Sequence, residues 1–407
     1  MKRLLTVLFI VFIQLLNTDI AFAFMANALS DIGAGRPEGE DFLEKQQVQE
    51  WLEPLEIADL LLFSAHADDE HLFFAGVLPY CVAYGIKAQV VYMTNHDDNP
   101  IRNTERLEGL WAVGVRNFPV VSLFPDLYAE SLNGAIKAYQ KRGFVEDDFI
   151  DFCVANIRRF KPQVVVGHDI DGEYGHGTHM LSAICLQKAL ELTADSSYHS
   201  VSAEEFGLWD TPKTYLHLWP EREITINIDE PLEFFDFKSA FQVSQYGFSF
   251  HKSQHWMSFY KWLNGTATAP ISNSSEIVKY PPGKFGLYRT LVGEDSESAA
   301  DFFEHVLLHK DMLKIAAEIA DHVAEEEKSS YLPSQDRQAG KAGFEDENLQ
   351  EKNFLNDTSL NNIKIEELLA ENIKKPLQIR AIFGIVLLAA LIMLLTVKLR
   401  GKHHGPN

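Results

Sequence analysis

Residues 59–70 read DLLLFSAHADDE. The first seven form a short apolar run that ends where polar residues begin. A continuous apolar run of this length is typical of a strand that is buried on both faces of a parallel sheet. The stretch therefore predicts a buried strand whose carboxyl end leads into a loop of histidine and acidic residues.

Strands and helices alternate from this stretch onward. Apolar runs predict strands at 87–94, 119–124 and 163–167 and two more within 214–228, and helical patterns lie at 71–84, 102–115, 147–160, 176–192, 233–246 and 299–325. This alternation predicts an α/β domain with a doubly wound, mostly parallel, Rossmann-like sheet. Ligands bind such sheets beyond the carboxyl ends of the strands.

Two of the predicted strands end in clusters that can bind a metal. The first cluster holds His66, Asp68 and Asp69, and the second reads HDIDGEYGHGTH at residues 168–179. Histidine and aspartate are ligands for zinc, and of two adjacent carboxylates one can bind metal while the other acts as a base. Either cluster alone could merely cap the next helix. Together, at the ends of two parallel strands, they indicate metal-assisted hydrolysis.

These clusters resemble those of the PIG-L/LmbE-type zinc-dependent N-acetylglucosaminyl deacetylases. That family carries a strand followed by A-H-P-D-D-E, and later a loop of the form D-x-x-G-x-Y-G-H-x-x-H. Residues 65–70 read AHADDE, and residues 169–179 read DIDGEYGHGTH. Between them, the family's R-x-x-E helix that ends in L-G-V is matched by 102–105 and 113–115, and a weaker match lies at 238–245. The resemblance covers residues 59–245 and implies the LmbE-like form of the fold.

The resemblance also implies roles for the residues of the two clusters. His66, Asp69 and His179 correspond to the ligands of a zinc ion, although iron or another divalent metal also fits. Asp68 corresponds to the general base that takes a proton from the attacking water.

Three further residues receive roles from the same resemblance. His176 corresponds to the group that stabilises the oxyanion or protonates the leaving amine, and Tyr174 to a residue that supports the oxyanion. Arg102 corresponds to a residue that contacts substrate or orients the metal loop. An Arg102–Glu105 pair on the helix surface remains the alternative.

The chain departs from the family pattern in three places. Ala67 stands where proline is usual, which we expect to loosen the loop. Thr178 stands where aspartate is common, so a partner of a metal ligand is expected to be missing. The aromatic residues of 250–290 match nothing in the family and form either a sugar-stacking or lipid-facing wall or ordinary core.

Composition restricts the function further. The chain has 407 residues and a formal net charge of −22, which argues against nucleic acid as a partner because phosphate backbones need a basic face. The cysteines Cys81, Cys153 and Cys185 lie in apolar surroundings without paired spacing. We expect them to be small buried hydrophobes, with a single disulfide left open.

Both ends of the chain carry membrane signals. Residues 1–23 have the basic start, apolar stretch and A-x-A site of a signal peptide, the alternative being an uncleaved anchor. Residues 381–397 form an uncharged apolar run that predicts a transmembrane helix, the alternative being a buried core helix. A polar tether (328–375) precedes this run and a basic cytoplasmic tail (398–407) follows it. The catalytic body (24–327, core 59–246) is then extracytoplasmic, in the periplasm or at the cell surface.

The sequence thus predicts a membrane-anchored enzyme that hydrolyses an N-acyl group, most simply the N-acetyl group of an amino-sugar glycan or glycolipid. That substrate class comes from the resemblance, because spacing alone indicates only metal-assisted hydrolysis. Two alternatives stay open: a hydrolase of another amide or ester, and a non-catalytic glycan-binding surface protein. Asp68 favours an enzyme, since a binding protein needs no general base beside its metal.

Overall fold

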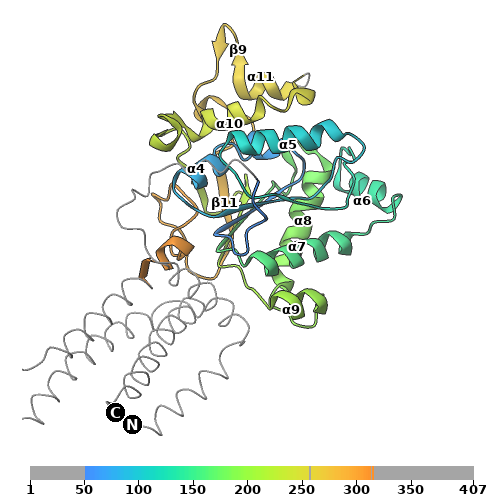
Figure 1. Ribbon diagram of the computed structural model, residues 1–407. Helices are drawn as coiled ribbons and strands as arrows, with labels where there is room; N and C mark the ends of the chain where they lie inside the picture. Colours follow the sequence, from blue (N-terminus) through green and yellow to red (C-terminus); the bar gives the residue numbers. More distant parts are fainter. Residues whose placement is uncertain (1–50, 256–257, 313, 316–407) are drawn as a thin grey trace, which may run out of the picture. The chain divides into compact units, whose positions relative to one another are not determined.

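The computed structural model describes residues 51–255, 258–312 and 314–315 (Figure 1). The predicted signal peptide, the tether, the transmembrane helix and the basic tail lie outside these residues. Among the helices that are described, none is both long and apolar enough to cross a membrane. The described residues from 51 to 310 belong to one compact unit, and the fold described below is that of this unit.

The centre of this unit is a seven-stranded sheet with the strand order β3-β2-β1-β4-β5-β11-β6. The strands are β1 (Leu60–Ser64), β2 (Ala88–Tyr92), β3 (Val120–Val121), β4 (Val164–Gly167), β5 (Lys213–His217), β6 (Glu223–Thr225) and β11 (Lys284–Thr290). The pairs from β3 through β5 are parallel, and β11 lies antiparallel to both β5 and β6. The predicted mostly parallel α/β sheet is therefore confirmed, with an antiparallel edge added to it.

Helices cover both faces of the sheet (Figure 1). One face carries α3 (Asp69–Leu72), α4 (Val77–Ala83), α5 (Pro100–Ala112) and α10 (Ala240–Phe248), and the other carries α6 (Leu132–Gln140), α7 (Glu146–Phe160) and α8 (Gly177–Leu192). Strand β1 is buried on both sides: Leu60 and Leu62 belong to the first core, and Leu61 and Phe63 to the second. This two-sided burial explains why the strand is apolar from Leu60 to Phe63.

The winding of the chain reverses between β1 and β4. From β1 the chain runs outward to β2 and β3, and then returns to place β4 on the other side of β1. The loops after β1 and β4 therefore meet at the switch point, where α/β sheets hold their ligands. The Ala65 N–H donates to His168 Nε2 across this point, at 2.8 Å.

The predicted helix at 71–84 is wrong as a single element. Helix α3 ends at Leu72 and α4 begins only at Val77. Between them Gly76 has φ of 89°, and a Cβ there would lie 2.6 Å from the Ile228 side chain. The close approach and the left-handed backbone both need glycine, so the chain turns instead of continuing a helix.

Three features of the second half also differ from the prediction. The expected helix at 233–246 begins only at Ala240, because residues 231–239 contain the hairpin β7 (Pro231–Leu232) and β8 (Lys238–Ser239). The expected helix at 299–325 is absent over 299–308, and helical residues begin at His309. Strand β11 was not predicted.

The three cysteines are free and buried, as expected, so the disulfide left open does not form.

Candidate metal centre

Three predicted metal ligands converge where β1 and β4 end. His66 Nδ1 lies 3.0 Å from His179 Nε2, and Asp69 Oδ2 lies 3.2 Å from the first atom and 3.3 Å from the second. Ligand atoms around a tetrahedral zinc ion, with bonds of about 2.0–2.2 Å, stand roughly 3.3 Å apart. The three atoms therefore have the spacing of ligands around one ion.

A carboxylate on the far side of each ring, hydrogen-bonded to His179 and in ion-pair contact with His66, determines which ring nitrogens face the centre of this triangle. His179 Nδ1 lies 2.6 Å from a Glu173 oxygen, and His66 Nε2 lies 3.3 Å from Asp126 Oδ1. A carboxylate only accepts, so it favours the proton on the nitrogen next to it. The opposing nitrogens then point lone pairs at each other over 3.0 Å, an arrangement that requires a cation or a proton between them. The residues fit a divalent metal.

The electrostatics of the triangle favour positive charge. Burial lowers the pKa of His66, but Asp126 and Asp69 outweigh it and raise the value to about 10. Burial likewise opposes the rise at His179, where Asp69 and Glu173 raise the pKa to about 9. Asp69 is buried too, yet the two histidines hold its pKa well below its usual range. The same negative carboxylates that stabilise positive charge on these rings would also stabilise a divalent cation bound between them.

Glu173, which the sequence analysis did not single out, is the partner that was expected to be missing. It is fully buried, and its carboxylate lies 2.6 Å from His179 Nδ1, 2.8 Å from His168 Nδ1 and 2.7 Å from His217 Nδ1. Thr178 donates instead to the Leu127 carbonyl, at 2.9 Å. Glu173 thus serves as the hydrogen-bond partner of a metal ligand, the role expected for the family's aspartate. It also orients two further histidines.

His168 lies close to the triangle, but both of its ring nitrogens already have hydrogen-bond partners. Its atoms fall within 4.8 Å of those of Asp69 and His179, as expected for a possible ligand. However, its Nε2 accepts the Ala65 N–H and its Nδ1 faces Glu173. Both ring nitrogens have partners, so His168 supports the loop and does not complete the ligand set.

Asp68 lies beside the triangle in an unusual backbone conformation. Its φ is 138°, a region that non-glycine residues rarely occupy, and its N–H donates to Glu70 Oε2 at 2.9 Å. Strain of this kind persists only where the surroundings hold it. Burial raises the pKa of Asp68, Arg102 lowers it and Asp69 raises it, and the outcome is about 7. Such a carboxyl can exchange a proton near neutral pH.

Arg102 orients the metal loop. It donates to the Ala67 carbonyl, and its Nη2 lies 3.2 Å from Asp68 Oδ1. Glu105, the partner in the surface-pair alternative, instead accepts hydrogen bonds from Ser253 at 2.7 and 2.5 Å. Arg102 therefore faces the site.

Ala67 gives the loop a backbone hydrogen bond, and whether the loop is looser than with proline stays a prediction. Its N–H donates to His96 Nε2 at 3.2 Å, and His96 Nδ1 lies 3.3 Å from Asp126 Oδ2. Proline, usual at this position, has no N–H and could not make this bond. The departure from the family pattern thus adds a contact that leads through Asp126 to His66.

His176 and Tyr174 line one side of the triangle. The Thr178 N–H donates to His176 Nδ1 at 3.1 Å, which leaves the proton of the neutral ring on Nε2. The His176 ring centre lies 4.7 Å from that of His66 and 4.8 Å from that of His179. Burial lowers the pKa of His176, as do the two neighbouring histidines. The Tyr174 ring packs 5.4 Å from His176.

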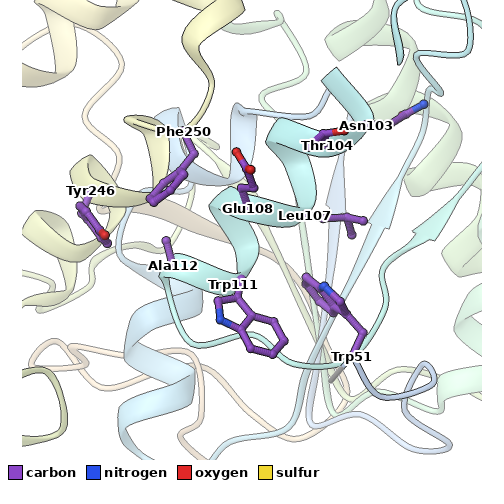
Figure 2. A pocket seen from close by; sticks show the side chains of 9 residues that line it. All are labelled: Trp51, Asn103, Thr104, Leu107, Glu108, Trp111, Ala112, Tyr246 and Phe250. Carbon is purple, nitrogen blue, oxygen red and sulfur yellow. The ribbon is translucent and has the colours of Figure 1, made fainter. Parts of the chain in front are cut away.

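The aromatic residues of 250–290 are spread over the first core, which contains Phe285, the border of the site and a separate pocket. Phe259, in α11 (Ser258–Asn264), packs 4.9 Å from Tyr174 and so borders the site. Phe250 instead lines a separate pocket of about 460 Å³ along α5, with Trp51, Trp111 and Tyr246 among its other walls (Figure 2). None of the residues of this pocket belongs to the metal cluster.

The fold and the cluster together define a class: a Rossmann-like α/β domain whose switch point carries a His–Asp–His ligand triangle beside a carboxyl group. Residues 61–190 match the family model PIG-L, described as GlcNAc-PI de-N-acetylase.

Named relatives agree with this assignment. A 1D-myo-inositol 2-acetamido-2-deoxy-alpha-D-glucopyranoside deacetylase of Geodermatophilus obscurus is 26% identical over 38% of this chain and 60% of its own length. The protein of the same name from Rhodococcus erythropolis is 27% identical over 38% of this chain and 59% of its own length. The chain thus spans less than two thirds of these relatives. The N,N'-diacetylchitobiose deacetylase of Pyrococcus horikoshii, with its inhibitor MPG, has a TM-score of 0.39 at 14% identity, covering 62% of this chain and 94% of its own. That score is too low to bear on function.

Proposed function

We propose that this protein is a metal-dependent deacetylase that removes the N-acetyl group from an amino sugar of a glycan or glycolipid. The observation that carries the proposal is the Asp68 carboxyl beside the His66–Asp69–His179 triangle, because a base next to a metal site serves hydrolysis and not mere binding. The names of the relatives support the substrate class, since they are deacetylases of a 2-acetamido-2-deoxy-glucopyranoside.

The chain's own residues divide the work of the reaction. A divalent ion held by His66, Asp69 and His179 would polarise the amide carbonyl and make water a stronger nucleophile. The Asp68 carboxylate accepts the proton that the attacking water loses, and Arg102 holds that carboxylate in place. His176 Nε2–H is a donor suited to the developing oxyanion or to the departing amine.

The decisive test is Asp68→Ala. Loss of a general base lowers turnover by about 10²–10⁴-fold, while the three metal ligands remain. We expect acetate release from N-acetylated sugars to collapse and the metal content of the purified chain to stay nearly the same. Asp171→Ala is the matched control, because Asp171 is exposed in the loop after β4 and touches no member of the triangle. Activity that survives in Asp68→Ala would refute the mechanism.

A substrate panel separates this function from its alternatives. N-acetylglucosamine conjugates, other acyl amides and simple esters are offered to the same preparation. A preference for the first group supports the proposal, and a preference for another group assigns the site to a different amide or ester. Binding of the sugars without any turnover of any substrate would leave a glycan-binding protein.

We further propose that the catalytic body is exported and anchored by residues 381–397, with the tail at 398–407 in the cytoplasm. The basic start, the A-x-A site and the uncharged apolar run support this arrangement. Protease added to intact cells or spheroplasts should then digest the body and leave the tail protected. Activity recovered in the cytosol would contradict it.

A further inference from the structure

A second group of metal-binding side chains lies apart from the triangle. Glu70 and His71 come from α3, and His251 follows α10. All three are fully buried. Glu70 Oε1 lies 3.5 Å from His71 Nε2 and 3.8 Å from His251 Nε2, and one ligand atom from each residue falls within 4.8 Å of the others.

The polar atoms of this group are unsatisfied. Within the described residues, Glu70 Oε1 and both ring nitrogens of His71 and of His251 have no hydrogen-bond partner. A buried polar group without a partner costs about 1–3 kcal/mol, and native proteins rarely leave several together. The other oxygen of Glu70 is occupied by the Asp68 N–H. The cluster therefore has unused ligand atoms, and the Tyr92 hydroxyl, which interacts with Glu70, is likewise without a hydrogen-bond partner within the described residues.

A glycine on α5 leaves space where the two rings converge. A Cβ added at Gly109 would lie 2.7 Å from His71 Nε2 and 2.7 Å from His251 Nε2. Gly247 on α10 approaches the His71 ring in the same way, since a Cβ there would lie 2.6 Å from its Cε1. The two glycines leave room for both imidazole rings, each of which directs its Nε2 toward Glu70 Oε1.

Two arginines near this group leave Glu70 Oε1 unpaired. Arg102 is committed to Asp68 and the Ala67 carbonyl. Arg106 lies with its guanidinium 5.2 Å from the centre of the Tyr92 ring, and its Nε and Nη1 have no hydrogen-bond partner within the described residues. A buried carboxylate that makes no ion pair with either arginine is costly in a dry interior, and a small cation bound to it lowers that cost.

We propose that Glu70, His71 and His251 bind a second divalent metal ion, of the zinc class, apart from the His66–Asp69–His179 centre. Two imidazole nitrogens and one carboxylate oxygen are a ligand set that suits zinc and disfavours magnesium or calcium. The three ligands are fully buried, so the role of the ion is structural. It connects α3, which begins with Asp69, to the end of α10.

Metal stoichiometry of the full chain in detergent tests this inference. After dialysis against metal-free buffer and reconstitution with zinc, we expect two equivalents in the unaltered protein and one in His251→Gln. His255→Gln is the matched control, because His255 also packs against Phe248, at 5.7 Å, but lies outside the group. That control should keep two equivalents. If the unaltered protein binds one equivalent of zinc and His251→Gln binds the same amount, the proposal is overturned. Buried water would then satisfy the polar atoms of the cluster.

A complementary variant covers the case in which His251→Gln does not fold. His179→Gln disables the first centre and leaves the second group intact, so it should still bind one equivalent of cobalt, with the visible spectrum of a nitrogen- and oxygen-ligated ion. Gly109→Ala in the otherwise unaltered chain should remove that second equivalent, because the added methyl group occupies the space between the two rings. If His179→Gln retains no bound cobalt, the second site does not exist. Because this readout is stoichiometry, it is independent of whether the first centre deacetylates sugars.

Discussion

Glu173 shows how one residue can set the state of several others. Its two oxygens face Nδ1 of His168, His179 and His217. A carboxylate accepts from all three rings, which places the proton of each on Nδ1 and leaves Nε2 of His179 free to bind metal. Burial opposes ionisation of Glu173, but His168 and the other two rings hold its pKa well below its usual range.

Glu173→Gln should therefore weaken metal binding without touching a ligand. The glutamine amide brings two N–H donors against rings that must themselves donate, so at least one histidine has to change tautomer. We expect metal affinity to fall by about 10–100-fold, as measured by competition with a chelator of known affinity. Glu146→Gln, which breaks only the partly exposed Glu146–Lys188 pair, is the control and should leave affinity unchanged. Equal affinity in both variants would show that Glu173 does not orient His179.

Among the elements, α7 and α9 (Ser200–Phe206) are joined by a single buried side chain. Arg158 is completely buried near the end of α7, and its guanidinium donates to five carbonyls and one hydroxyl. The acceptors are the carbonyls of Leu192, Thr193, Asp195, Tyr198 and His199 and the hydroxyl of Ser202. One arginine thus donates six hydrogen bonds to the segment that runs from the end of α8 into α9.

Arg158→Met should destabilise this part of the fold. Methionine fills much of the space but removes all six hydrogen bonds that the guanidinium donates, so we expect the free energy of unfolding to fall by about 2–4 kcal/mol. Urea unfolding followed by circular dichroism measures the change, and Arg159→Met, at an exposed neighbouring position, should lie within about 0.5 kcal/mol of the unaltered protein. Metal content per folded chain should not change. A loss confined to metal binding would contradict this structural role.

The elements that could be predicted are those whose pattern is local. The strand predicted from Asp59 and the helix that ends at Phe160 are recognisable from short stretches of sequence. A strand buried on both faces has consecutive apolar residues, and a helix buried on one side has apolar residues at helical spacing. The helix predicted from His71 fails because Gly76 is needed for its approach to Ile228, a contact over 152 positions of the chain (228 − 76). Strand β11 escapes prediction because its partners β5 and β6 are distant in sequence.

The candidate site divides in the same way. His66, Asp69 and His179 could be predicted because each lies in a recognisable motif next to a strand end. Asp126 and Glu173 could not, because a carboxylate that supports a histidine carries no spacing signal of its own. The fold brings Asp126, from the segment after β3, to within 3.3 Å of His66.

At the scale of the whole molecule, a metal that joins both halves of the sheet should also stabilise the fold. Ligands that bind only the native state add about 4 kcal/mol at a concentration 1,000 times their dissociation constant. Treatment with a chelator should therefore lower the melting temperature, and zinc should restore it. Magnesium is the control and should not, because it prefers oxygen ligands. A melting temperature that is insensitive to chelation and to zinc would count against a bound metal.

The hydrogen bond between Ala67 and His96 couples the two positions to each other. A proline at position 67 removes the N–H that donates to His96 Nε2. A residue at position 96 that cannot accept a hydrogen bond leaves the N–H of Ala67 without a partner. Each change is harmful alone, while the pair together removes both sides of the bond. The two positions, 29 apart, should therefore behave as an epistatic pair. In a double-mutant cycle, Ala67→Pro should cost less stability when His96→Leu is already present.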